Sequence, residues 1–242
     1  MQTKHSEKIF KTISMTNKRG FCMSNMPTNP EQATLSTGTT TLAMVCKDGL
    51  VLAADKRATA GYMIANKKTE KIQQIADKMV ITMAGTVSDA QLLTKLIKAE
   101  LQLKKIRGSR EPTVKEAANL LANMVYGNIR RMSMIPGIAH FIVGGNDETG
   151  NYIYDIYPDG SLSLIDDYIS SGSGSVMAFG VLETLYQKNM TINEGVEIAI
   201  KALNAAMQRD IASGNGAMIV TVTKDGVKKV FDQDIEAFLK HK

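Results

Sequence analysis

The sequence contains few of the residues that build disulfide frameworks and metal sites. Its 242 residues include two cysteines and three histidines, and there is no tryptophan. Cys22 and Cys46 are too few for a disulfide scaffold, and they show no spacing typical of metal ligands. The histidines lie far apart in sequence, at His5, His140 and His241, so no zinc motif can be composed from them. We therefore expect a protein that uses no metal and no cofactor.

Long apolar runs and clusters of basic and aromatic residues are also absent. Nothing approaches the roughly 18 consecutive apolar residues of a membrane span, and the Ile9-Phe10 run near the N-terminus is too short for a secretory signal. The net charge of +5 is spread along the chain and aromatic residues make up 5%, whereas a nucleic-acid surface clusters Lys and Arg with interleaved aromatics. These absences predict a cytoplasmic protein that binds neither membranes nor nucleic acids.

The first 38 residues differ from the rest of the chain. They are polar, rich in Thr, Ser, Asn and Lys, and carry two of the five prolines. Neither the helical nor the strand period persists there, so we expect a loosely structured segment. Translation could start at Met1, Met15, Met23 or Met26, and a tail without a role remains an alternative for residues 1–25.

From residue 39 onward, turn signals and hydrophobic periods predict strands and helices in separate blocks. The expected strands are 39–47 and 50–54, joined by an Asp-Gly turn, then 62–65, 72–75, 79–83, 139–145, 152–157, 161–165, 217–223 and 227–231. The expected helices are 88–108, one after the capping box Thr113-x-x-Glu116, 176–187, one after the capping box Thr191-x-x-Glu194, and a short one at 235–240. The segment 170–175, taken by its Gly and Ser content alone, favours a flexible loop.

The block order predicts the fold class. Strands, two helices, strands, two helices and a hairpin suit two packed sheets with helices outside, an α+β arrangement, rather than the alternation of a parallel α/β fold. The chain length suits one large domain. On the first helix we expect one inward face, made of Leu92, Leu93, Leu96, Ile97 and Leu101. On the fourth we expect another, made of Val196, Ala199, Ile200, Leu203 and Met207.

One stretch stands out chemically, the glycine and three threonines of Ser36-Thr37-Gly38-Thr39-Thr40-Thr41. Alone it would be read as a threonine-rich edge strand. It is followed, however, by Asp55-Lys56-Arg57-Ala58-Thr59, Thr69-Glu70-Lys71-Ile72, Met83-Ala84-Gly85, Ser171-Gly172-Ser173-Gly174-Ser175 and Arg209-Asp210-Ile211-Ala212-Ser213-Gly214. With these motifs in this order, residues 39 to about 231 resemble a mature proteasome β-subunit of the archaeal type. The resemblance implies the four-layer α-β-β-α sandwich of the N-terminal nucleophile hydrolases.

The resemblance also implies that the chain is cut between Gly38 and Thr39. Residues 1–38 would then be a propeptide removed by autocatalytic cleavage, and residues 39–242 the mature catalytic domain. A threonine hydroxyl is a poor nucleophile without a base, and a freed α-amino group, with its reference pKa of about 7.7–8.0, can serve as one near neutral pH. The uncut chain lacks that amine, so the leader would act as an off switch.

The family's supporting residues carry over to matching positions. Lys71 and Asp55 would assist proton movement at Thr39, although each taken singly would be read as a surface charge. Gly85 would offer its backbone N–H to an oxyanion, although a plain strand-to-helix turn explains it equally. A network around the threonine amine would consist of Ser173, Asp210 and Ser213, with Ser171 and Ser175 as neighbouring alternatives for the first serine.

Four residues are expected to bind substrate. Thr59 would pair an extended peptide through its main chain, with Arg57 beside it shaping the channel. Ala58, Met83 and Val87 would line an apolar pocket, whose size suggests cleavage after large hydrophobic residues.

The resulting hypothesis is a catalytic β-subunit of the 20S proteasome core particle, a threonine endopeptidase that degrades unfolded proteins. The family's architecture implies homo-oligomeric heptameric β-rings, α-subunits as partners, and an ATPase unfoldase acting through the α-ring. The main alternative is a non-catalytic ring-forming subunit that keeps the fold and loses the chemistry. More remote alternatives are an α-subunit, the smaller bacterial relative and another amidohydrolase of the same fold.

Overall fold

In the computed structural model, residues 38–133 and 136–234 are described. The expected propeptide, apart from Gly38, and the expected short helix at 235–240 lie outside the described residues. Within the described ranges the chain forms the elements of two antiparallel sheets and the helices that cover them.

The first half of the chain supplies strands and one helix pair. The strands are β1 (Thr41–Cys46), β2 (Gly49–Asp55), β3 (Ala58–Ala60), β4 (Met63–Asn66), β5 (Ile72–Ala76) and β6 (Met79–Gly85). The helices are α1 (Val87–Gly108) and α2 (Val114–Arg130).

The second half again combines strands with one helix pair. The strands are β7 (Ala139–Asp147), β8 (Gly150–Ile156), β9 (Leu162–Ile165), β10 (Tyr168–Ser171), β11 (Gly216–Thr223) and β12 (Gly226–Asp234). The helices are α3 (Ser175–Leu185) and α4 (Ile192–Arg209). No helix of the described ranges is both long and apolar enough to cross a membrane.

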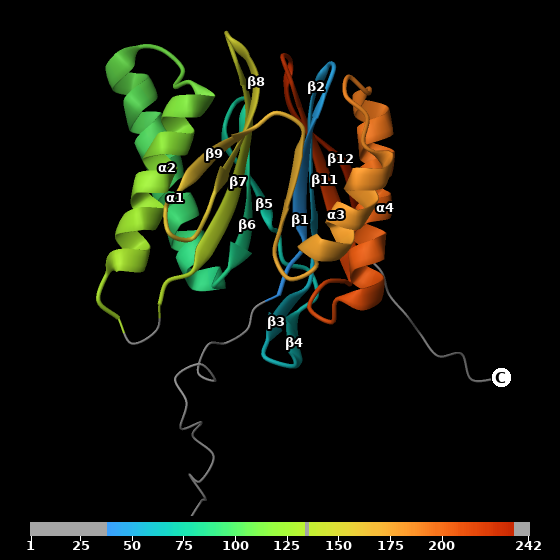
Figure 1. Ribbon diagram of the computed structural model, residues 1–242. Coiled ribbons are helices and arrows are strands. Elements are labelled where there is room, and N and C mark those ends of the chain that lie inside the picture. The colour runs from blue at the N-terminus through green and yellow to red at the C-terminus, as the bar shows by residue number, and fades with distance from the viewer. Residues whose placement is uncertain (1–37, 134–135, 235–242) are drawn as a thin grey trace, which may run out of the picture. The chain divides into compact units, whose positions relative to one another are not determined.

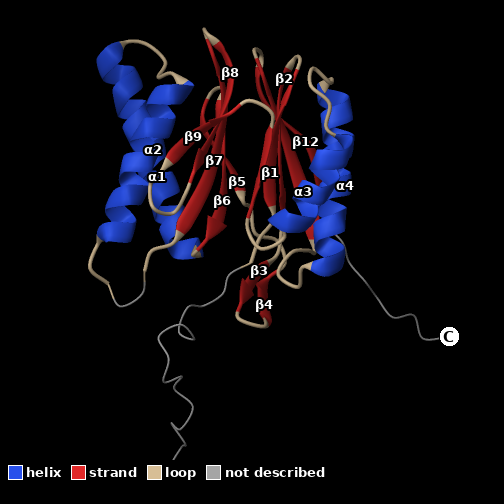
Figure 2. Ribbon diagram, in the orientation of Figure 1, coloured by secondary structure: helices blue, strands red, loops and turns tan. Residues whose placement is uncertain are grey.

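The strands form two five-stranded antiparallel sheets, which pack face to face. One has the order β10-β1-β2-β11-β12 and the other the order β5-β6-β7-β8-β9, while β3 and β4 form a separate hairpin. Helices α1 and α2 cover the outer face of the β5–β9 sheet, and α3 and α4 cover the outer face of the other (Figures 1 and 2). The predicted four-layer α-β-β-α sandwich is therefore confirmed.

Alternation along the strands builds three layers of apolar core. On β7, Phe141 and Val143 face α1 and α2, whereas Ile142 between them faces the other sheet. A third cluster lies between α3, α4 and their own sheet and includes Leu42 and Leu182. Strand β2 is buried on both faces, which explains why its residues 50–54 are all apolar; the buried Asp55 ends the strand.

The inward faces of two helices differ from the prediction. On α1, Leu92 and Leu96 are 47% and 45% exposed, and the small residues Ala90 and Thr94 are buried in their place. On α4, Ile200 is exposed and Val196 and Met207 are only partly buried. The buried stripe of α4 contains Gly195, Ile198, Ala199, Ala202, Leu203 and Ala206. The other predicted residues, Leu93, Ile97 and Leu101 on α1 and Ala199 and Leu203 on α4, are buried. Small residues let a helix axis approach its sheet closely, so selecting residues by side-chain size identified each face only in part.

Two strands were not predicted. Strand β10 lies in part in the segment that its composition assigned to a loop, and it pairs antiparallel with β1, Ser171 opposite Thr41. Strand β3 pairs with β4, which begins one residue later than expected. Both short strands owe their conformation to a partner strand, which local composition does not reveal.

Both predicted capping boxes are present. At the start of α2, the Thr113 Oγ1 accepts from the backbone N–H of Glu116 at 3.2 Å, and Glu116 accepts from the Thr113 N–H at 3.0 Å. The same reciprocal pair joins Thr191 and Glu194 at the start of α4. Each box satisfies backbone donors that a helix start otherwise leaves unpaired.

Replacing the first cap tests this assignment. We expect Thr113→Ala to lower the free energy of unfolding by about 1 kcal/mol, because the N–H of Glu116 loses its acceptor. Denaturant titration followed by circular dichroism would measure the difference. Thr113→Ser keeps the hydroxyl and should stay near the unsubstituted value; equal losses in both variants would contradict a capping role.

Candidate active site

The sequence around Thr39 leads into the buried start of β1, at the end of the sandwich from which the β3–β4 hairpin extends (Figure 1). Thr39 is 6% exposed. In this uncut chain its backbone N–H donates to Ser173 Oγ at 3.2 Å. The preceding N–H, that of Gly38, donates to Thr59 Oγ1 at 3.0 Å. Side-chain oxygens thus bind the backbone N–H groups of both Gly38 and Thr39.

Asp55 ends β2, where its carboxylate gathers donors from four segments. Its Oδ1 accepts from Lys71 Nζ at 2.6 Å and from the Thr40 N–H at 2.8 Å. Its Oδ2 accepts from the N–H groups of Arg57 and Gly214, each at 3.0 Å. Since the Asp55 and Lys71 side chains are 0% and 3% exposed, this is a buried ion pair whose carboxylate is fully hydrogen-bonded.

The environment of Lys71 changes its proton affinity. Burial lowers the pKa of Lys71 below the ordinary lysine value, and the adjacent Asp55 carboxylate opposes that shift. A buried lysine with a lowered pKa gives up its proton more readily than an exposed lysine. Lys71 immediately precedes β5 and also lines the pocket that contains Thr39.

A second acidic group supports the other side of Thr39. Asp210 follows the last residue of α4, and its Oδ2 accepts from Ser173 Oγ and Ser213 Oγ, both at 2.6 Å. Ser213 Oγ in turn lies 2.6 Å from Thr40 Oγ1. This network places a hydroxyl, Ser173 Oγ, beside the nitrogen of Thr39.

The three serines of the Gly/Ser motif have different surroundings. Ser173 is the one of the three that contacts the Thr39 nitrogen. Ser171 ends β10 and bonds instead to His140 at 2.7 Å, and Ser175 opens α3. Strand β10 pairs with the start of β1, with Ser171 opposite Thr41, and α3 follows it, which brings this motif to Thr39.

Gly85 ends β6 in a conformation that favours glycine. Its φ is +105°, in the region that side-chain-bearing residues rarely adopt. A Cβ at this position would overlap the carbonyl oxygen of Ile138. Gly85 lines the same pocket as Thr39 and Lys71, one residue before the Thr86 cap of α1.

A side chain at Gly85 should therefore disturb both stability and the pocket. We expect Gly85→Ala to cost about 1–3 kcal/mol of unfolding free energy through backbone strain alone. Thermal unfolding would measure this loss. Gly127→Ala is a matched control, since Gly127 lies in α2 without a positive φ, and a Cβ added there would meet no packed neighbour within 4 Å; equal behaviour of the two variants would contradict the strain argument.

The expected pocket residues come together around Thr39. Ala58, Met83 and Val87 line one pocket with Gly38 and Thr39. Sequence reasoning missed further lining residues, which are Thr69, Glu70, Ala84, Ala90 and Gln91. Thr69 and Glu70 stand in the same motif as Lys71, so the motif itself could have indicated them.

Thr59 and Arg57 contribute differently from the pocket residues. The Thr59 side chain bonds to the Gly38 N–H, as described above, and does not line the pocket. Arg57 Nε donates to Asn215 Oδ1 at 2.8 Å, and its NH1 donates to the Ile211 carbonyl at 2.7 Å. The Arg57 guanidinium thus braces the loop between α4 and β11 that carries Ser213.

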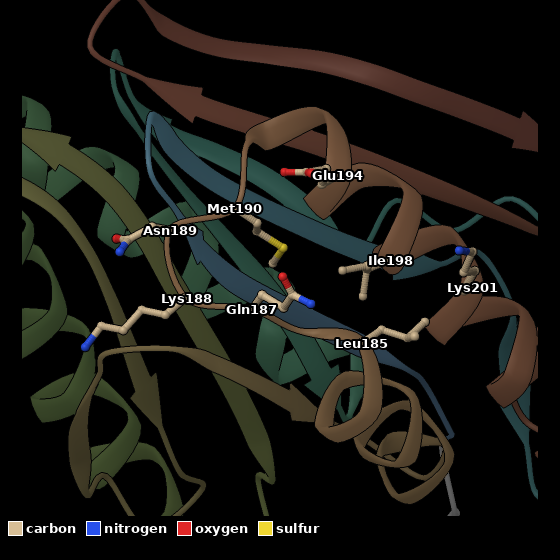
Figure 3. A pocket seen from close by; sticks show the side chains of 8 residues that line it. All are labelled: Leu185, Gln187, Lys188, Asn189, Met190, Glu194, Ile198 and Lys201. Carbon is tan, nitrogen blue, oxygen red and sulfur yellow. The ribbon is translucent and has the colours of Figure 1, made fainter.

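Two other features lack the chemistry of a catalytic site. Burial raises the pKa of Cys46 to about 12, so its thiol is not a nucleophile near neutral pH. A separate hollow of about 410 Å³ lies between the end of α3 and α4 (Figure 3), away from Thr39. Its lining is Leu185, Gln187, Lys188, Asn189, Met190, Glu194, Ile198 and Lys201. This set contains no hydroxyl, thiol or imidazole.

Comparison with known proteins gives a consistent family match. Residues 35–222 match the family described as "Proteasome subunit". A "Proteasome subunit beta" of Ferroglobus placidus is 45% identical over 202 residues, which cover 84% of this chain and 94% of the relative. The protein of the same description from Methanoregula boonei is 44% identical over 211 residues, covering 87% of this chain and 97% of the relative. That of Archaeoglobus profundus is 43% identical over 202 residues, covering 84% and 92%.

Proposed function

The chain belongs to the proteasome subunit family, with archaeal β-subunits among its relatives, and from this premise we propose that it is a catalytic β-subunit acting as a threonine endopeptidase. The observation that carries the proposal is the convergence of Thr39, the buried Asp55–Lys71 pair and the Ser173–Asp210 pair around one pocket. Thr39 would supply the nucleophile, and the Asp55–Lys71 pair would assist the proton transfer. The Ser173–Asp210 pair would hold the nitrogen of Thr39 in place.

Acylation begins at the hydroxyl of Thr39. After cleavage of the Gly38–Thr39 bond, the freed amine would lie near Ser173 Oγ, where the peptide nitrogen lies now. Thr39 Oγ attacks the substrate carbonyl carbon, and its proton passes to the amine, with Lys71 assisting. The tetrahedral intermediate expels the leaving amine, which takes that proton, and an ester to Thr39 remains. Water then attacks the ester with the same amine as base and releases the second product.

The developing oxyanion needs a hydrogen-bond donor in the pocket. We assign this role to the backbone N–H of Gly85, which lines the pocket with Thr39 in a positive-φ conformation that most other residues adopt only with strain. The Asp55 carboxylate keeps Lys71 oriented, and Asp210 does the same for Ser173. Apolar residues Ala58, Met83 and Val87 would receive a large hydrophobic side chain of the substrate.

Removal of residues 1–38 is part of this proposal. A side chain at Gly38 would overlap Ala212 Cβ and lie 2.8 Å from Ser173 Oγ, so glycine is required before the threonine in this arrangement. Thr39 would cut its own preceding bond and thereby gain the amine that the mechanism uses. Residues 39–242 would then be the mature domain.

The family also indicates the setting of the chain. The names of its relatives support assembly into rings with other proteasome subunits. We propose heptameric β-rings enclosed by α-rings in the cytoplasm, with unfolded polypeptides delivered by an ATPase unfoldase. A non-catalytic ring subunit is disfavoured because such a role gives no reason to bury a lysine and an aspartate beside a threonine.

The deciding measurement is the intact mass and N-terminal sequence of the chain purified with an α partner. A chain that begins Thr-Thr-Thr-Leu-Ala-Met, in particles that cleave peptides, would support the mechanism. A retained leader in assembled, peptide-cleaving particles would contradict it, because the amine would then be absent.

A further inference from the structure

Three polar residues outside the proposed catalytic set face one another between the two sheets. His140 is the second residue of β7, Asp155 lies in β8 and Ser171 ends β10. The neighbours of His140, Ala139 and Phe141, point toward the helix layer, so His140 points toward the opposite sheet. The three residues come from three different strands, and β10 belongs to the other sheet.

The side chains form one hydrogen-bonded chain. His140 Nε2 lies 2.6 Å from Asp155 Oδ1, and His140 Nδ1 lies 2.7 Å from Ser171 Oγ. An ionised carboxylate only accepts, so Nε2 donates to Asp155. In the tautomer that carries its single proton on Nε2, Nδ1 accepts from the Ser171 hydroxyl. The Tyr157 ring stacks on His140 with centroids 4.8 Å apart and holds the imidazole in plane.

The order serine, histidine, aspartate is that of a hydrolase triad. Ser171 and Asp155 are 3% and 1% exposed, however, and unlike Thr39 neither lines the pocket described above. A substrate bound in that pocket would not meet the Ser171 hydroxyl. The chain of hydrogen bonds is better suited to hold the two sheets at a fixed separation.

What it connects are the two walls of the Thr39 pocket. On one side Ser171 pairs with Thr41 and continues through Gly172 to Ser173, which bonds the Thr39 nitrogen. Gly172 has a φ of +95°, and a Cβ there would overlap the Thr39 carbonyl, so this connection is tightly packed.

On the other side His140 leads directly to the oxyanion wall. Across the β6–β7 ladder, His140 pairs with Ala84, and its neighbour Ala139 pairs with Gly85. The Ser171–His140 bond therefore joins the sheet that carries Thr39 to the sheet that carries Gly85.

We propose that Asp155, His140 and Ser171 form an inter-sheet clamp that sets the separation of Thr39 and Gly85, with His140 as a positioning residue; this rests on the function proposed above. The nucleophile and the oxyanion donor must both meet one carbonyl group, and a displacement of about 1 Å can reduce turnover by about 100-fold. Of the pocket residues, Ala58 lies on β3, outside this connection, whereas Met83 lies on β6 with Gly85. An apolar contact tolerates a small shift better than bond formation does, so substrate binding should change little.

Three variants test the clamp in the assembled particle. With a fluorogenic peptide that carries a large apolar residue before the scissile bond, Ser171→Ala should lower kcat about 10-fold or more and leave KM within about twofold. His140→Phe keeps the stack with Tyr157 and loses the hydrogen bonds to Asp155 and Ser171, so its kcat should fall as far as that of Ser171→Ala. His140→Asn places an amide oxygen near the position of Nδ1 and should recover part of kcat. Ser175→Ala, from the same motif, is the control and should be unchanged.

Amide exchange of residues 172–176 provides a readout that does not depend on activity. It should rise in Ser171→Ala and His140→Phe and return toward the unsubstituted level in His140→Asn. Unchanged kcat and exchange in Ser171→Ala would overturn the clamp, as would His140→Asn performing no better than His140→Phe. Inactive unsubstituted particles, or active Thr39→Ala particles, would instead contradict the proposed function, and exchange alone would then judge the clamp.

Discussion

Replacing Thr39 with alanine is expected to abolish peptide hydrolysis and to leave residues 1–38 attached. The substitution removes the one oxygen that forms the ester, while the Asp55–Lys71 pair and Asp210 stay in place. Loss of a nucleophile reduces turnover by several orders of magnitude, so kcat should fall by at least about 10⁴-fold. The mass of the purified chain and cleavage of a fluorogenic peptide by the assembled particle would show both effects.

The matched variant is Thr39→Ser, which keeps a hydroxyl and, after cleavage, an α-amine. It should process its leader and retain measurable activity. Because Thr39 is 6% exposed and sits against Gly172, loss of the methyl group leaves a small gap that lowers its rate without removing the chemistry. Processed, peptide-cleaving Thr39→Ala particles would show that another group is the nucleophile.

Breaking the buried ion pair should produce the second large effect. Lys71→Met removes the partner of a carboxylate that is 0% exposed, and an uncompensated buried charge costs about 3–5 kcal/mol. The same substitution removes the group that assists proton transfer, which should lower kcat by about 10²–10⁴-fold. Denaturant unfolding and peptide cleavage would measure the two losses separately.

A double variant separates stability from catalysis. In Lys71→Met with Asp55→Asn both charges are gone, so much of the lost unfolding free energy should return while activity stays low. The remaining donors to Asp55, from Thr40, Arg57 and Gly214, can be satisfied by the amide oxygen in part. A double variant that regained activity would mean that Lys71 acts only through stability.

Local features of the fold could be predicted from the sequence. The two capping boxes, the Asp-Gly turns and the block order each depend on residues within a few positions of one another. Strand β10 could not, because its partner is β1, with Ser171 opposite Thr41. The inward faces of α1 and α4 were predicted only in part, because small residues such as Ala90 and Gly195 form contacts that were assigned to larger ones.

The site residues also differ in how far they could be predicted from the sequence. The motif order and the spacings of Asp55 and Lys71 from Thr39 pointed to these residues through a family resemblance, since each charged residue taken singly reads as a surface charge. Residues that act through contacts distant in sequence went unnoticed, such as Thr40, whose hydroxyl meets Ser213. In the sequence, His140 stands only as one of three histidines too far apart to form a zinc motif. Its partners Asp155 and Ser171 lie on other strands, so the sequence gives no sign of the contact.

The contacts around Thr39 also bear on when this chain becomes active during folding. Its nitrogen bonds a serine 134 positions away, Asp55 bonds an amide 159 positions away, and Thr40 bonds a serine 173 positions away. Contacts of such high order form late, because loop closure must precede them. A partly folded chain therefore has the threonine, lysine and aspartate without the contacts that bring them together. Under the proposed mechanism, no peptide bond would be cut before the topology is complete, which would protect newly made chains from one another.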